Sequence, residues 1–219
     1  ENPTLKRSPP TASRARWRSA LQLHAMASRT LLLATLLSSQ FCDALLTVKY
    51  FAYGSNLAES VREGRRGLSP LSTEAGFVRD HRLAFNVPGF APTEPAFASI
   101  APANGEECHG GVYELSVNDW LRLCASEGVP FGYRVVEVEV QQYAGGSVSA
   151  WTLEAGLPSF LGDLQPSERY LSLIRDGAKE LGLTRAWQEK LAAVPTAQFG
   201  TRAAERSADY ERRRGEVFV

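Results

Sequence analysis

The chain has 219 residues, of which 44% are hydrophobic and 22% charged, the composition of a globular domain with one sizeable core. Basic and acidic residues balance at 24 each. Six of the basic residues fall before residue 45, so the remainder is mildly acidic. A mildly acidic body without a basic stripe disfavours a nucleic-acid-binding surface.

The first 44 residues are predicted to lie outside the folded body. Residues 1–25 are basic and lack a hydrophobic period, so we expect them to be disordered or foreign to the natural product. Residues 26–44 begin with the single methionine and carry an apolar run, as a secretory signal does. One long targeting extension is the alternative. The location therefore stays open between the secretory pathway, an organelle and the cytoplasm. The apolar run at 31–37 is too short for a stable membrane anchor.

The predicted domain, residues 45–200, opens with a strand carried by Val48, Tyr50, Phe51 and Tyr53. This strand stops at Gly54-Ser55-Asn56. A tight turn of this kind exposes backbone N–H groups that can hold an anionic or carbonyl oxygen. An ordinary turn that closes a core strand is the alternative.

Further strands are predicted through the middle of the chain. Residues 76–87 read as a strand pair or as one long bent strand, stopped by Pro88-Gly89 and followed by a Pro-rich loop. Residues 96–101 and 110–115 are predicted to form a hairpin that turns at Asn104-Gly105.

The next stretch predicts a helix followed by a second hairpin. Ser116 begins a capping-box pattern, and the helix that it opens ends at Gly128. Residues 133–143 alternate as a strand, and Gly145-Gly146 turns the chain into its partner at 148–153.

The last third predicts two helices. The first has Pro166 in its first turn and ends at Gly182, with Gly177 as an interruption, and the second runs from Thr184 to Val194. The charged, aperiodic residues 201–219 are expected to be a disordered tail. Strands followed by helices predict a single α+β domain with antiparallel hairpins.

Glu127 is the candidate for proton transfer. A carboxyl group shielded from solvent can both accept and donate protons near neutral pH. Glu127 stands at a helix end, just before a strand that begins with Tyr133, so both side chains could face one cavity. A solvated glutamate at a helix end is the simpler alternative.

Other combinations of reactive residues fit known sites less well. The run 106–109, Glu-Glu-Cys-His, lacks the helical spacing of metal ligands. Ser55 with a histidine lacks a Gly-x-Ser-x-Gly elbow. Three cysteines are too few for a disulfide scaffold; Cys108 and Cys124 could pair in an oxidising compartment, but Cys124 is more simply part of the core.

Three segments together resemble the γ-glutamylcyclotransferase family. They are Tyr50–Asn56, then Glu127–Val129 with 133–138, then Pro166–Leu171 continuing into 177–183. The resemblance covers about residues 48–200. It implies a mixed β-barrel with flanking helices and no cofactor or metal. It also implies conversion of a γ-glutamyl amino acid to 5-oxoproline and the free amino acid.

The resemblance also implies a role for each site residue. Glu127 would be the general base and acid. The backbone amides of Gly54, Ser55 and Asn56 would hold substrate oxygens. Tyr133 would orient the amine, Tyr53 would form part of the pocket wall, and Tyr170 would cover the pocket entrance.

The Pro-rich segment 87–95 departs from the best-known members, which leaves the substrate open. A γ-glutamylamine, including one linked through a lysine side chain, is one alternative. A non-catalytic module that binds a small ligand on the same fold is another. The oligomeric state also stays open.

Overall fold

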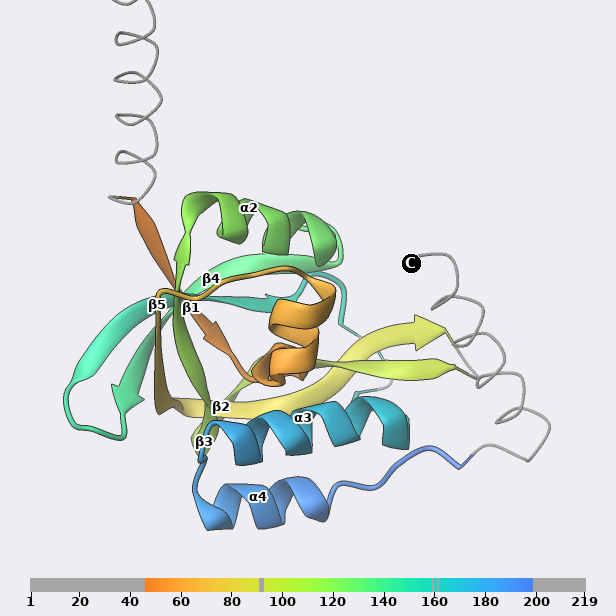
Figure 1. Ribbon diagram of the computed structural model, residues 1–219. Coiled ribbons are helices and arrows are strands. Elements are labelled where there is room, and N and C mark those ends of the chain that lie inside the picture. The colour runs from red at the N-terminus through yellow and green to blue at the C-terminus, as the bar shows by residue number, and fades with distance from the viewer. Residues whose placement is uncertain (1–45, 91–92, 159, 161, 199–219) are drawn as a thin grey trace, which may run out of the picture. The chain divides into compact units, whose positions relative to one another are not determined.

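The computed structural model describes residues 46–90, 93–158, 160 and 162–198 (Figure 1). The expectations for the extension, the leader and the charged tail concern residues outside this part. Within the described part, no helix is long and apolar enough to cross a membrane.

Five strands close into a barrel in the order β1-β3-β2-β4-β5. Neighbouring strands are antiparallel except at the closure, where β1 and β5 run parallel and Tyr50 lies opposite Trp151. The predicted α+β class, a mixed barrel with flanking helices, is confirmed. The strands are β1 (Thr47–Ala52), β2 (Ser72–Phe90), β3 (Glu94–Ser116), β4 (Tyr133–Gln142) and β5 (Ser147–Ala155).

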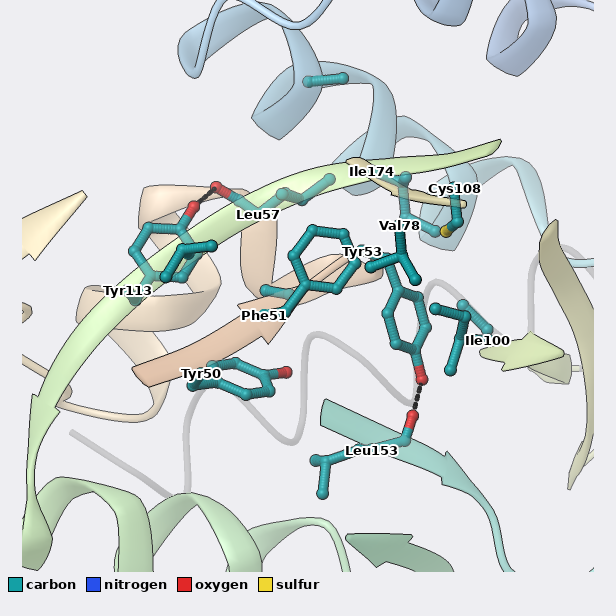
Figure 2. Close-up of a cluster of buried hydrophobic side chains, with 14 of the residues drawn as sticks. Tyr50, Phe51, Tyr53, Leu57, Val78, Ile100, Cys108, Tyr113, Leu153 and Ile174 are labelled. Atoms are coloured by element: carbon teal, nitrogen blue, oxygen red, sulfur yellow. Dashed lines mark hydrogen bonds between the residues drawn. The ribbon is translucent and has the colours of Figure 1, made fainter. Parts of the chain in front are cut away.

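The opening strand is confirmed, and it is buried on both faces. Tyr50, Phe51 and Ala52 are consecutive buried residues, and the Tyr50 ring packs against Trp120 of the helix that follows β3, with ring centroids 5.8 Å apart. Figure 2 shows Phe51 and Tyr53 within the central apolar cluster.

The hairpin predicted at Asn104-Gly105 is wrong, because β3 runs continuously from Glu94 to Ser116. The chain turns instead between Phe90 and Glu94, inside the predicted Pro-rich loop, where the Thr93 N–H donates to the Phe90 carbonyl at 3.1 Å. Nor does β2 stop at Pro88-Gly89, since Pro88 still pairs with Ala96.

Asn104-Gly105 lies where the register between β2 and β3 shifts. Arg79 pairs with Glu107, whereas His81 pairs with Pro102, so the extra residues of this bulge belong to β3. Gly105 takes a positive φ of 79° and donates its N–H to Asp80 Oδ1 at 2.8 Å. A left-handed residue suits a bulge as well as a turn, which explains the misassignment.

The second predicted hairpin is confirmed. Residues 133 to 142 form β4, and β5 follows a turn in which Gly145 and Gly146 have φ values of 100° and 83°. Val138 and Val140 share a face of β4 and are both buried, as the alternation predicts.

In the described part of the chain, three α-helices flank the barrel: α2 (Val117–Ser126), α3 (Glu168–Glu180) and α4 (Arg185–Ala192). Each helix is capped at its start by a hydroxyl side chain that accepts the backbone N–H three residues later. The capping residues are Ser116, Ser167 and Thr184 respectively. Pro166 therefore precedes the cap of α3 and does not lie in its first turn. Helices α3 and α4 lie side by side, away from α2 (Figure 1).

Gly177 does not interrupt α3; it lets the helix approach the short 3-10 helix η1 (Ser55–Leu57). A Cβ at this position would lie 2.3 Å from the Ala58 nitrogen and 2.4 Å from the Leu57 carbonyl carbon. Backbone contact between α3 and η1 fixes the turn that follows β1.

The charged segment after η1 is more buried than predicted. It contains a π-helical turn, η2 (Ser60–Arg65), in which Val61 and Arg62 are buried. The Arg62 guanidinium donates to the Leu57 carbonyl at 2.9 Å and to the Tyr113 hydroxyl at 3.0 Å, which compensates its burial.

Candidate active site

A cavity of about 740 Å³ lies where β1 ends. Its size suits a small molecule. The structure brings together in its wall all seven residues predicted from sequence: Tyr53, Gly54, Ser55, Asn56, Glu127, Tyr133 and Tyr170.

Glu127 is placed by the end of α2, of which it is the C-terminal cap. Its side chain is 16% exposed. Oε1 accepts from Asn56 Nδ2 at 3.0 Å and pairs with Arg66 Nη2 at 2.7 Å. Both donors therefore reach the same oxygen, and in the described part of the chain no protein group donates to Oε2.

Arg66 is a site residue that the sequence does not predict. It stands in a charged run that reads as a surface connection, so no local signal distinguishes it. Its second guanidinium nitrogen, Nη1, donates to the hydroxyl of Ser126, the residue before Glu127. Arg66 thus contacts the end of α2 at two neighbouring residues and offsets the negative charge of Glu127.

Asn56 links the first segment of the site to the second. Its side chain is buried, and the amide nitrogen donates to the Tyr50 hydroxyl at 3.0 Å as well as to Glu127. Burial, and to a lesser degree the Glu127 carboxylate, raises the pKa of Tyr50 above its ordinary value. Tyr50 is a neutral hydroxyl in the cavity wall, and it was predicted only as part of the opening strand, without a role in the site.

Three further tyrosines hold backbone groups with their hydroxyls. Tyr53 donates to the Leu153 carbonyl (Figure 2). Tyr133 donates to the Ala98 carbonyl at 2.8 Å, and Tyr170 accepts the Ala98 N–H at 3.1 Å. Burial raises the pKa of all three, that of Tyr170 to about 12. They are neutral at physiological pH, and Tyr133, whose proton is donated to Ala98, can still accept a hydrogen bond.

The turn after β1 is the 3-10 helix η1, with Gly54 as its N-terminal cap. The amides of Ser55 and Asn56 belong to its first turn, where N–H groups have no acceptor within a helix. Gly54 has an ordinary φ of −100°, and a Cβ there would touch Ala98 Cβ at 3.4 Å and Tyr170 Oη at 3.5 Å. Space beside the turn is therefore limited but sufficient for one methyl group.

A second carboxylate, Glu94, also lines the cavity and was not predicted. It is buried, accepts the Ser167 hydroxyl at 2.6 Å and forms an ion pair with Arg169. These contacts compensate its buried charge and tie the start of β3 to the start of α3.

The Glu-Glu-Cys-His run at 106–109 and Cys124 lie outside this cavity. A smaller cavity of about 380 Å³, lined by Leu83, Trp187 and their neighbours, contains none of the predicted site residues. His109 is packed against Trp187 with ring centroids 4.9 Å apart. Cys108 and Cys124 are both free thiols. No cluster of three or more potential metal ligands occurs in the described ranges.

Comparison with known proteins finds similarity to the AIG2-like family and to γ-glutamyl cyclotransferases. The model of the AIG2-like family matches residues 107–191. The chain is 34% identical over 170 residues to γ-glutamyl cyclotransferase gliK of Aspergillus fumigatus, covering 67% of this chain and 62% of that protein. It is 30% identical over 164 residues to γ-glutamylcyclotransferase of Homo sapiens, covering 73% of this chain and 85% of the human protein.

A solved structure titled γ-glutamyl cyclotransferase has the same fold. It superposes with a TM-score of 0.63 at 27% identity, covering 77% of this chain and 99% of the solved one.

Proposed function

Because the chain belongs to the AIG2-like, γ-glutamylcyclotransferase family, we propose that it converts a γ-glutamyl amino acid to 5-oxoproline and the free amino acid. The observation that carries this proposal is the gathering of every predicted site residue around Glu127 in one cavity. The proposal assigns the proton transfers to Glu127.

The reaction is an internal acyl transfer. The substrate's α-amine loses a proton and attacks its own γ-carbonyl, which forms the C–N bond of the five-membered ring. The original amide C–N bond then breaks, and the departing nitrogen gains a proton. Atoms balance without water or a redox partner, so one carboxylate that takes the first proton and returns it to the leaving nitrogen suffices.

The contacts of Glu127 favour Oε2 as the oxygen that moves the proton. Asn56 and Arg66 hold Oε1 at 3.0 Å and 2.7 Å, which fixes the plane of the carboxylate. Oε2 has no competing protein donor among the described residues, so its lone pairs stay open to a substrate amine.

The remaining residues fit the positioning of a folded substrate. The amides of the Gly54–Asn56 turn would stabilise the oxyanion that forms on the γ-carbonyl. Tyr133 would accept a hydrogen bond from the amine, and this would orient its lone pair toward the carbonyl. Tyr53 and Tyr170 would wall and cover the site. Holding amine and carbonyl in an attacking geometry supplies much of the acceleration for a ring closure.

An assay of 5-oxoproline release tests this function. Purified protein is incubated with a panel of γ-glutamyl dipeptides, glutathione and γ-glutamyl-lysine linked through the side-chain amine. We expect 5-oxoproline from γ-glutamyl dipeptides. Turnover confined to the amine-linked compound would instead indicate a γ-glutamylamine cyclotransferase. No 5-oxoproline from any compound, with binding retained, would indicate a non-catalytic module.

A further inference from the structure

The charged residues of the cavity wall are unevenly balanced. Among the described residues, four arginines line the cavity, against two glutamates, Glu94 and Glu127. The arginines are Arg65, Arg66, Arg122 and Arg169. A cavity with an excess of positive charge favours an anionic ligand.

Three of these arginines already face a carboxylate of the protein. Arg66 pairs with Glu127 at 2.7 Å, and Arg169 pairs with Glu94. Arg122 pairs with Asp119 at 3.2 Å and also donates to the Gly67 carbonyl at 2.6 Å. Their charges are therefore largely offset within the protein.

Arg65 differs from the other three. It is exposed at the last position of η2 and lies in the cavity wall, so it stands at the cavity mouth. Among the described residues it pairs with no carboxylate. Its neighbour along the chain, Arg66, contacts Oε1 of Glu127, the oxygen to which the proposed function assigns no proton transfer.

The proposed substrate supplies a matching group. In a γ-glutamyl amino acid the carboxylate of the leaving part is two bonds from the amide nitrogen that Glu127 would protonate. Glu127 and Arg65 line the same cavity, so a substrate whose amide nitrogen faces Glu127 would extend its leaving part along the wall that carries Arg65. A guanidinium recognises a carboxylate through charge-assisted hydrogen bonds with a matching planar geometry.

We propose that Arg65 binds the carboxylate of the leaving amino acid and thereby selects γ-glutamyl amino acids over γ-glutamylamines. This inference rests on the proposed function. A γ-glutamylamine has no carboxylate two bonds from the amide nitrogen. In the lysine-linked compound the carboxylate lies beyond the side-chain methylenes, out of reach of a group that binds next to the amide, and it stands beside an ammonium group that the Arg65 guanidinium repels. Arg65 is thus a specificity-determining residue and takes no part in the proton transfer.

The test compares γ-glutamyl-alanine with γ-glutamyl-alaninamide, which differ in one terminal group. We expect the wild-type kcat/KM to be about tenfold or more higher for the acid, the size of one or two hydrogen bonds between charged groups. Arg65→Gln should abolish most of this ratio by raising KM for the acid alone, since the carboxylate keeps its charge throughout the reaction and its ion pair with Arg65 stabilises substrate and transition state alike. Arg65→Lys should retain part of it.

Two controls separate recognition from structural damage. Arg185→Gln removes an arginine that is 93% exposed and paired with Glu189 on α4, away from the cavity, and should leave the ratio unchanged. Higher salt should reduce the wild-type ratio, because an exposed ion pair is screened. If Arg65→Gln keeps the wild-type ratio, the inference is wrong while the proposed function stands. If wild-type protein releases no 5-oxoproline from either compound, the proposed function itself fails.

Discussion

At the scale of single residues, the geometry of the site depends on how one carboxylate is held. The contact between Asn56 and Glu127 joins residues 71 positions apart, and Arg66 reaches the same oxygen. Sequence analysis identifies Asn56 and Glu127 separately because each stands in a recognisable segment. It does not identify Arg66, because a charged run carries no signal of where one member of it points.

His109 is a second residue with a defined electrostatic setting. Its ring packs against Phe77 and Trp187 at centroid distances of 5.2 and 4.9 Å, and Nδ1 lies 2.5 Å from the Tyr143 hydroxyl. Burial lowers the pKa of His109 below its ordinary value, although the Glu107 carboxylate nearby opposes the shift and Lys190 adds to it. The folded protein therefore favours the neutral imidazole.

This setting predicts that stability falls as the solution is acidified. A histidine in the unfolded chain has a pKa of about 6.5. Below that pH the unfolded state binds a proton at His109 more readily than the folded state does, and this favours unfolding. The contribution of His109 is complete above that pH and is lost as pH falls. Thermal unfolding should show a smaller loss of Tm between about pH 7.5 and 5.5 in His109→Gln than in wild type. Equal losses in the two proteins would contradict the assignment.

At the scale of elements, the site depends on the close approach of α3 to η1. Gly177 permits that approach, and η1 carries Ser55 and Asn56 into the cavity wall. Helix α3 also brings Tyr170 close to Gly54, where its hydroxyl accepts the Ala98 N–H. Packing and site geometry are therefore set by the same pair of elements.

We expect Gly177→Ala to destabilise the protein by about 1–3 kcal/mol, as overpacking does. Helix propensity alone would predict stabilisation by about 1 kcal/mol, but the new methyl would overlap the backbone of η1 at 2.3 Å. The displaced turn should also lower 5-oxoproline release. Urea unfolding and the activity assay measure the two effects.

Gly64→Ala is the matched control, because a Cβ at Gly64 meets no atom within 4 Å. It should leave stability close to that of wild type. Wild-type stability in Gly177→Ala would show that α3 and η1 can separate at no cost.

The helices and the second hairpin could be predicted because their signals are local. Ser116 and Thr184 cap helices through their own side chains, and Gly145-Gly146 supplies two left-handed residues in a row. The long β2–β3 ribbon could not be predicted, because Asn104-Gly105 fits both a hairpin turn and a bulge. Which one forms depends on the pairing partner in β2, and that partner lies far away in the sequence.

At the scale of the whole molecule, barrel closure assembles the cavity. The strands meet in the order β1-β3-β2-β4-β5, and the closing contact is the parallel pair between Tyr50 and Trp151. Alternation and turns predict the strands and the α+β class, whereas the family resemblance supplies the barrel. The four cavity arginines and the buried Glu94 come together only in the folded protein, since they come from the η2, α2, α3 and β3 regions of the chain.

Replacement of Glu127 by glutamine tests the central claim most directly. The amide oxygen of the new side chain could still accept from Asn56 and Arg66, so the fold and its Tm should stay close to wild type. The amide nitrogen would replace Oε2 and could not take a proton. We predict that 5-oxoproline release from a γ-glutamyl dipeptide falls by about 100-fold or more. A folded Glu127→Gln protein with wild-type turnover would show that Glu127 does not move the proton.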